Sequence, residues 1–140
     1  MRTPPPPGPW YNIGNRTRRE GRFLSAITLY HYPRCSTSRK ARQFLGELGA
    51  QVVERRYFTE LPTEEEIREL ARLLPRGVHD IVSTRSRRYR ELNLAGKELS
   101  EDQWVKLLAA EPGLWRRPIA VKGGRAVVGY DEEALRALVD

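Results

Sequence analysis

Residues 27–39, the stretch that decides the fold, read Ile-Thr-Leu-Tyr-His-Tyr-Pro-Arg-Cys-Ser-Thr-Ser-Arg. Residues 27–32 are rich in β-branched and aromatic side chains, as in a buried strand, and Pro33 ends that strand. Apolar residues then recur at i, i+3, i+4 and i+7, the spacing of an amphipathic helix: Ala41, Phe44, Leu45 and Leu48. Residues 52–58 predict a second strand, and a right-handed crossover makes the two strands parallel.

Downstream of this unit, residues from about 63 to 110 predict an all-helical insertion. Thr63 caps its first helix, and Glu66, three residues further on, completes a capping box. Residues 78–94 look helical, with an interruption near Ser83. This part of the insertion holds a charged stretch that contains Arg85, Arg87, Arg88 and Arg90.

The remaining elements complete the order β-α-β, helical insertion, β-β-α. Residues 100–103, Ser-Glu-Asp-Gln, open a further helix of the insertion. Residues 119–121 and 126–128 predict two strands joined across Gly123-Gly124, a two-residue turn typical of a hairpin. Asp131 then caps a last helix. This order predicts an α/β protein, a thioredoxin-like mixed sheet with an all-helical insertion.

Residues 1–25 differ in composition from residues 26–140, which we expect to form one domain. Pro4 to Pro7 and Pro9 favour polyproline II, and the polar, basic residues after them show no sustained period. Five Arg against one Glu give this segment a net charge of +4 out of a total of +7. A nucleic-acid partner therefore cannot be inferred from the total charge alone. The segment is either a basic arm that contacts phosphate or an extension without a catalytic role.

The composition also limits the function. The single Cys excludes an intrachain disulfide and a zinc site built from several thiolates, and we expect no bound metal or cofactor. No stretch approaches the roughly 18 apolar residues of a transmembrane helix. The N-terminus has no apolar core of a signal peptide. We therefore expect a cytoplasmic protein without a membrane partner.

Cys35 lies between the end of the first strand and the first turn of the following helix. Backbone N–H groups at a helix start are unpaired and stabilise an anion, so the pKa of a cysteine there is lowered. Arg34 and Arg39 add positive charge. An inert buried cysteine is the alternative, but it fits a strand interior better than this polar loop. His31, four residues earlier, either poises the thiol as an imidazolium or has a structural role.

The residues around the thiol favour an oxyanion ligand. Ser36, Thr37 and Ser38 supply hydroxyl and N–H groups that suit arsenate, phosphate or sulfate. Ser38 also stands where a Cys-x-x-Cys motif has its second cysteine, so the chain lacks that local disulfide. Arg117 either offers two parallel hydrogen bonds to a bound oxyanion or is one more solvated arginine. Pro118 begins the third strand, where a thioredoxin-like fold usually has a cis proline that faces the cysteine.

The chain resembles the glutaredoxin-coupled arsenate reductase family, which also contains the Spx-type transcriptional regulators. The resemblance runs from about Ile27 to the C-terminus and rests on the insertion, on Arg117-Pro118 and on the motif Tyr30-His31-x-Pro33-x-Cys35-x-x-Ser38-Arg39. It implies that Cys35 is the nucleophile, that His31 is the reductases' histidine before it, and that Arg117 binds the oxyanion.

Two further arginines of the reductases have no direct match. The one in their insertion falls on Ser83, with Arg85 two residues away as a weaker oxyanion-binding candidate, and the other falls on Gly129. Three segments instead resemble the regulators: Ile81-Val-Ser-Thr-Arg-Ser86, Pro112-Gly-Leu-x-Arg-Arg-Pro118 and Val128-Gly-Tyr-x-Glu132. Gly77 matches a glycine that the regulators place against the RNA polymerase alpha subunit. Yet Ser38 breaks their Cys-x-x-Cys switch, and they lack the histidine that His31 matches.

We predict a monothiol reductase in which Cys35 attacks an oxyanion, arsenate if the family name holds. The resemblance implies glutathione or another low-molecular-weight thiol as co-substrate and a glutaredoxin-like protein for recycling, because the chain has no second thiol. The alternative is a Spx-like regulator that binds the C-terminal domain of the RNA polymerase alpha subunit, with Gly77 on its contact face. A third possibility is a monothiol oxidoreductase that acts on protein or glutathione mixed disulfides.

Overall fold

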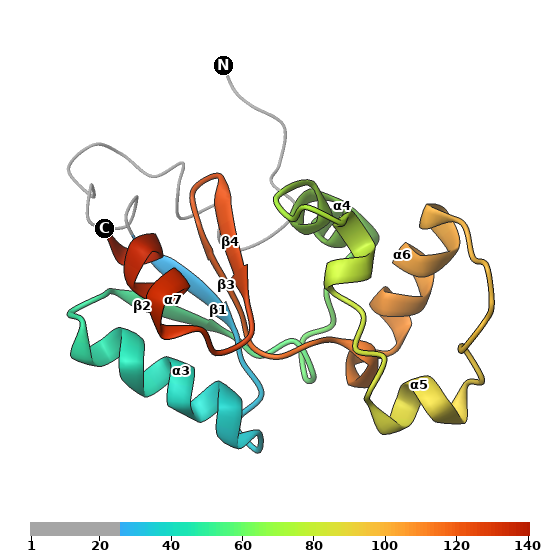
Figure 1. The fold of residues 1–140 in the computed structure, drawn as a ribbon, viewed down its shortest axis with the longest axis horizontal. Helices are drawn as coiled ribbons and strands as arrows, with labels where there is room; N and C mark the ends of the chain where they lie inside the picture. Colours follow the sequence, from blue (N-terminus) through green and yellow to red (C-terminus); the bar gives the residue numbers. More distant parts are fainter. Residues whose placement is uncertain (1–25) are drawn as a thin grey trace.

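The computed structural model describes residues 26–140, and the predictions for residues 1–25 lie outside that range. In chain order its elements are β1 (Ile27–Tyr30), α3 (Ser36–Glu47), β2 (Val52–Arg55), α4 (Glu64–Arg72), the 3₁₀ helix η2 (Gly77–Asp80), α5 (Arg87–Glu91), α6 (Glu101–Ala110), the 3₁₀ helix η3 (Pro112–Leu114), β3 (Ile119–Lys122), β4 (Arg125–Val128) and α7 (Glu132–Val139). Figure 1 shows the sheet with α3 and α7 on one side and the insertion, from α4 to α6, on the other.

The four strands form one mixed sheet in the order β2-β1-β3-β4. β1 is parallel to β2, with Ile27 opposite Val52, because α3 carries the chain back to the start of the pair. β3 is antiparallel to both β1 and β4. The turn between β3 and β4 needs a glycine, since Gly123 has a φ of 59°. The predicted α/β fold with a mixed sheet is confirmed.

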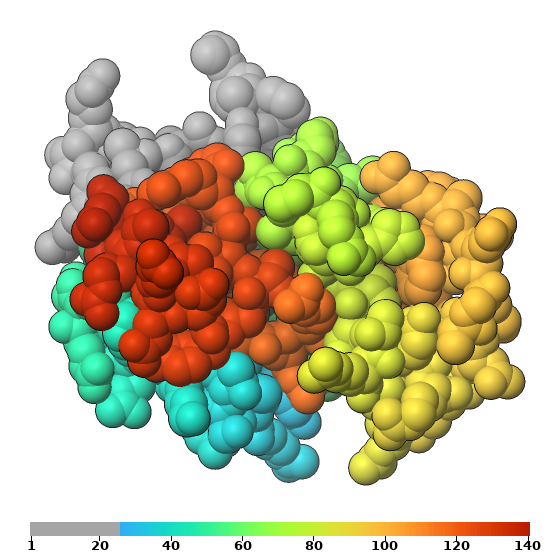
Figure 2. Space-filling model, in the orientation of Figure 1, coloured from blue at the N-terminus to red at the C-terminus, as the bar shows by residue number. Residues whose placement is uncertain are grey.

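Successive residues of β1 face two separate hydrophobic cores, because strand side chains alternate between the two sides of a sheet. Ile27 and Leu29 pack with residues of α3 and α7. Tyr30 belongs to the other core, where the insertion packs on the sheet. The space-filling view shows the same division, with the green-to-orange insertion on one side of the molecule (Figure 2). The loop that follows β1 therefore lies at the boundary between the two halves.

The interruption that the sequence predicts near Ser83, within residues 78–94, is confirmed. Two short helices, η2 and α5, stand on either side of it. Between them Val82 forms an antiparallel bridge with Trp115, and the Ser83 N–H donates to the Leu114 carbonyl at 2.7 Å. A continuous helix would need these backbone groups for its own hydrogen bonds, so pairing with residues 114–116 divides it in two.

Glu66 lies in the first turn of α4 but does not complete the predicted capping box. Its N–H donates to the Thr63 hydroxyl at 3.0 Å, which is half of the box. Its carboxylate turns inward and accepts from the Tyr30 hydroxyl at 2.6 Å and from the Arg55 guanidinium at 3.0 and 3.2 Å. Both charged side chains are buried, so an ion pair ties α4 to β2. Removal of either partner would leave a costly unpaired charge in the interior.

Candidate active site

Cys35 is the N-terminal cap residue of α3, and its backbone is extended, with φ −92° and ψ 123°. Its N–H donates to the Tyr32 carbonyl at 2.9 Å, and its carbonyl accepts from the Arg39 N–H at 3.0 Å. The Arg39 guanidinium also donates to the Pro33 carbonyl at 2.8 Å, which fixes the loop from both sides. The first turn of α3 has no acidic side chain, and Cys35 is partly exposed. The thiol therefore meets solvent at the positive end of a helix.

Opposing effects act on the ionisation of this thiol. Partial burial raises the pKa of Cys35, whereas hydrogen bonds from the Ser38 N–H and hydroxyl and from the Thr37 N–H lower it. The positive charge of Arg117 lowers the pKa further, and the net result is a lowered pKa for Cys35. Ser38 is buried beneath the loop, Thr37 is half-buried and Ser36 is exposed. Cys35 is thus more fully a thiolate near neutral pH than an ordinary cysteine.

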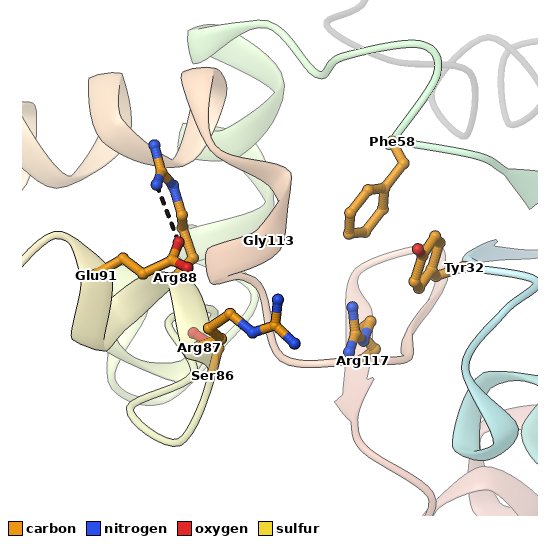
Figure 3. Close-up of a pocket in the computed structure, with 8 residues that line it drawn as sticks. All are labelled: Tyr32, Phe58, Ser86, Arg87, Arg88, Glu91, Gly113 and Arg117. Carbon is orange, nitrogen blue, oxygen red and sulfur yellow. Dashed lines mark hydrogen bonds and ion pairs between the residues drawn. The ribbon is translucent and has the colours of Figure 1, made fainter.

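Arg117 stands directly before β3, and the peptide bond between Arg117 and Pro118 is cis. The centre of its guanidinium lies 5.0 Å from the Tyr32 ring centroid and 5.9 Å from that of Phe58. The two rings stack with their centroids 4.0 Å apart. Figure 3 shows these three side chains grouped at one side of a pocket. Cation–π contacts hold the guanidinium in place, so Arg117 is a fixed, half-buried positive charge near Cys35.

The pocket beside Arg117 has a volume of about 400 Å³. It lies between two halves of the molecule: the sheet with α3 and α7, and the helical insertion. Its lining consists of Tyr32, Phe58, Ser86, Arg87, Arg88, Glu91, Gly113 and Arg117. Arg87 extends from the first residue of α5 toward Arg117 (Figure 3). Arg88 is paired with Glu111 at 2.7 Å and with Glu91 at 3.1 Å. Arg87 makes no ion pair within residues 26–140, so its charge is available to a ligand.

The structure does not bring Arg85 into this group. Arg85 precedes the Ser86 cap of α5 and lines a different pocket, together with Arg116. Arg87 follows the cap and lines the Arg117 pocket. In the sequence, Arg87 stands out only as part of a charged stretch. The signal that could have singled it out is Ser86 as a helix cap, because a cap separates the side chains on either side of it.

His31 has a different setting from the predicted imidazolium. It is 5% exposed, and its Nδ1 is buried without a hydrogen-bond partner among residues 26–140. Burial lowers the pKa of His31; Glu54 opposes this effect, and nearby arginines add to it. A neutral imidazole supplies no positive charge, so His31 is not the source of the lowered pKa of Cys35.

Tyr57 is a residue near the site that no sequence motif singles out. It is fully buried, and its ring stacks on Trp115 at 4.7 Å. Burial raises the pKa of Tyr57, the charge of Arg117 opposes that rise, and the charge of Cys35 adds to it. The buried Tyr57 hydroxyl therefore stays protonated. The position of Tyr57 just after a strand gives no signal in the sequence that its side chain is buried beside the site.

Gly77, the predicted partner contact, is the first residue of η2 and has a φ of 61°. A side chain at this position would meet nothing within 4 Å, so the surface there is open. Over residues 26–140, no group of three His, Cys, Asp or Glu side chains could hold a metal ion. In the same range, no helix has the length and apolar character needed to cross a membrane.

The fold and the site define a thioredoxin-like protein with an all-helical insertion and one cysteine at the start of a helix. The chain belongs to the ArsC family, whose model matches residues 30–138. The predicted family is therefore confirmed.

Transcriptional regulators and a solved arsenate reductase structure are similar to the chain. The global transcriptional regulator Spx of Listeria monocytogenes serovar 1/2a is 39% identical over 110 residues, which cover 79% of this chain and 84% of the relative. The regulatory protein MgsR of Bacillus subtilis is 36% identical over 112 residues, or 80% of this chain and 89% of the relative. The solved structure of an arsenate reductase from Vibrio cholerae superposes with a TM-score of 0.73 at 31% identity, over 81% of this chain and 97% of that one.

Proposed function

We propose that this protein is a monothiol reductase in which the Cys35 thiolate attacks an oxyanion held by Arg117. The observation that carries the proposal is the combination of a lowered pKa at Cys35 with a guanidinium fixed on two aromatic rings. A thiolate is a strong nucleophile, and a planar guanidinium donates two parallel hydrogen bonds to one oxyanion. Arg87 adds a second positive charge from the insertion.

With arsenate as the oxyanion, the reaction proceeds through two covalent steps. The Cys35 sulfur bonds to arsenic, and one arsenate oxygen takes up protons and leaves as water. A low-molecular-weight thiol such as glutathione then bonds through its sulfur to the Cys35 sulfur. The sulfur–arsenic bond breaks, and its electron pair reduces As(V) to As(III).

Recycling needs one more thiol, because Cys35 is the only cysteine of the chain. The second step leaves Cys35 in a mixed disulfide with the small thiol. A further thiol, on a small molecule or on a glutaredoxin-like protein, attacks this disulfide and releases the Cys35 thiolate. The chain's own residues supply the nucleophile, the N–H groups of residues 36–38 and the charge of Arg117, and the other reactants supply the electrons.

A turnover assay with arsenate, glutathione and glutaredoxin tests the proposal. Arsenite formation that disappears in Cys35→Ser would support it. A parallel assay replaces arsenate with a glutathione mixed disulfide. Turnover of the mixed disulfide without arsenite formation would show that the protein reduces mixed disulfides through Cys35. It would contradict the proposal that the substrate is an oxyanion.

A Spx-like regulator is the second candidate, and the similarity to the Listeria regulator and the open surface at Gly77 favour it. We infer that such a regulator would bind the C-terminal domain of the RNA polymerase alpha subunit over η2. Gly77→Arg should then abolish capture of that domain. Gly96→Arg is a matched control, because Gly96 also lies in the insertion with a positive φ of 78° and open space around it. Equal loss in both variants, or no capture by the natural chain, would count against the regulator.

A further inference from the structure

A second pocket, separate from the one beside Arg117, lies between η2 and the segment that leads into β3. Its volume is about 410 Å³. Three arginines, one histidine and two hydroxyl residues make up most of its lining: Arg76, Arg85, Arg116, His79, Ser83 and Thr84. The lining includes no acidic side chain and no Phe, Tyr or Trp ring. The proposed reductase chemistry uses none of these residues.

Backbone hydrogen bonds fix the two chain segments that form the pocket. The Ser83 N–H donates to the Leu114 carbonyl at 2.7 Å, and the Arg116 N–H donates to the Ile81 carbonyl at 2.7 Å. Between these two hydrogen bonds, Val82 forms an antiparallel β-bridge with Trp115. Arg116 is thereby held beside residues 83–85, which are distant from it in sequence. The backbone of the site is therefore in place before a ligand binds, so less backbone entropy is lost on binding.

A turn presents Thr84 and Arg85 at its tip. The Ser86 N–H and hydroxyl both donate to the Ser83 carbonyl, at 3.3 and 3.0 Å, which closes the turn. The Ser86 hydroxyl also accepts from the Tyr89 N–H at 3.1 Å and so joins the turn to α5. Both ends of the turn are therefore anchored, one to residues 114–116 and the other to a helix.

The charges of the pocket are not balanced within the described structure. Arg85 and Arg116 are exposed and form no ion pair with an acidic side chain of residues 26–140. Arg76 has one partner, Asp80, at 3.7 Å. Three guanidinium groups around one hollow repel one another, and a bound anion would relieve that repulsion. Two of the three guanidinium groups thus lack a carboxylate partner among residues 26–140, whereas Asp80 contacts both the side chain and the backbone N–H of Arg76.

We infer that this pocket binds the phosphate group of a small phosphate monoester. A tetrahedral dianion can accept hydrogen bonds from several guanidinium groups and two hydroxyls at once, whereas a planar carboxylate uses fewer of them. The pocket volume leaves room for an organic group beside the phosphate. The imidazole of His79 is the only aromatic ring in the lining, so little there would recognise the organic group. Recognition therefore rests on the phosphate.

A ¹⁵N–¹H NMR titration of the full chain with inorganic phosphate tests this inference. We expect saturable shifts of the amide signals of residues 83–85 and Arg116. Signals of residues 36–38 report separately on anions at the Cys35 loop, so failure of the proposed reductase site and failure of this pocket are distinguishable. Sodium chloride and sodium acetate at equal ionic strength are the control anions, and we expect them to produce much smaller shifts.

Variants then locate the binding. Arg85→Gln and Arg116→Gln should each weaken phosphate binding about tenfold or more, since each removes a charged hydrogen-bond donor. Arg85→Lys, which keeps the charge but loses the planar fork, should fall between Arg85→Gln and the natural chain. Arg136→Gln on α7 makes the same change of charge elsewhere and should alter binding less than twofold.

Three results would overturn the inference. The first is the absence of saturable shifts at residues 83–85. The second is an equal response to acetate, which would point to a carboxylate-bearing partner. The third is a response to duplex DNA without a response to inorganic phosphate, which would make these arginines part of an extended surface for a polyanion rather than a phosphate pocket.

Discussion

Arg116 and Arg117 are neighbours in the chain, but their side chains line different pockets. Arg117 is half-buried on two aromatic rings, near a thiol whose pKa its charge lowers. Arg116 is exposed, among other arginines and hydroxyl groups. Arginines line both pockets, yet only Arg117 lies near the cysteine. The surroundings of each arginine would thus decide whether a bound anion reacts or is only held.

The two pockets also differ in how they depend on the fold. The Arg117 pocket takes Tyr32 and Phe58 from the sheet half and Arg87 from the insertion, so it needs both halves to keep their relative positions. The Arg116 pocket is lined by six residues of the insertion, between Arg76 and Arg85, and by Arg116 itself. A change at the junction of the halves should therefore disturb the first pocket more than the second.

Loss of the thiol should produce the largest effect and act on one pocket alone. Cys35→Ser replaces the thiolate by a hydroxyl that stays protonated near neutral pH. We expect oxyanion turnover to fall by about 10³-fold or more. The phosphate-induced shifts of residues 83–85 should stay as they are in the natural chain. Turnover that survives the substitution would mean that Cys35 is not the nucleophile.

Loss of the buried ion pair should have the next largest effect. Glu66→Gln leaves the Arg55 guanidinium buried without its charged partner and should lower the free energy of unfolding by about 3 kcal/mol or more. Glu69→Gln, on the same helix, breaks an exposed pair with Arg72 and should cost about 1 kcal/mol or less. Urea unfolding measures both values. Equal losses in the two variants would show that the ion pair does not hold the junction.

Arg117→Lys should have a smaller but specific effect. Lysine keeps the positive charge but cannot present the planar fork or lie over the rings of Tyr32 and Phe58 in the same way. We expect turnover to fall by about tenfold or more, while the melting temperature changes little. Arg136→Lys makes the same exchange over the ring of Phe44, on α7, and should leave turnover unchanged. A loss of similar size in both variants would remove the special role of Arg117.

Local signals in the sequence predicted most of the fold. The helix start at Ser100, the Asp131 cap and the glycine hairpin turn all stand where their motifs indicated, because each depends on residues within a few positions. Glu66 departed from prediction because its partners, Tyr30 and Arg55, lie in other elements, and the buried contacts with them overrode the local pattern.

The residues of the candidate site show the same difference between local signals and long-range packing. The place of Cys35 at a helix start followed from the strand, the proline and the helical stripe around it. The choice between Arg85 and Arg87 depended on which side of a capped turn each residue lies. The burial of His31 depended on how α3 and β2 pack around the end of β1, which spacing alone does not contain.

The smallest expected effect concerns the pH dependence of Cys35 alkylation. Because the pKa of Cys35 is lowered, the alkylation rate should reach half of its maximum below about pH 8.5, the value for an unperturbed thiol. Ser38→Ala removes a hydroxyl that stabilises the thiolate, so it should move the midpoint to higher pH. His31→Ala should leave the midpoint in place, because burial lowers the pKa of His31 and the ring carries no charge near neutral pH. A midpoint that rises in His31→Ala as much as in Ser38→Ala would show that His31 is protonated when the thiol ionises. It would then be His31, together with Arg117, that distinguishes the reactive pocket from the one beside Arg116.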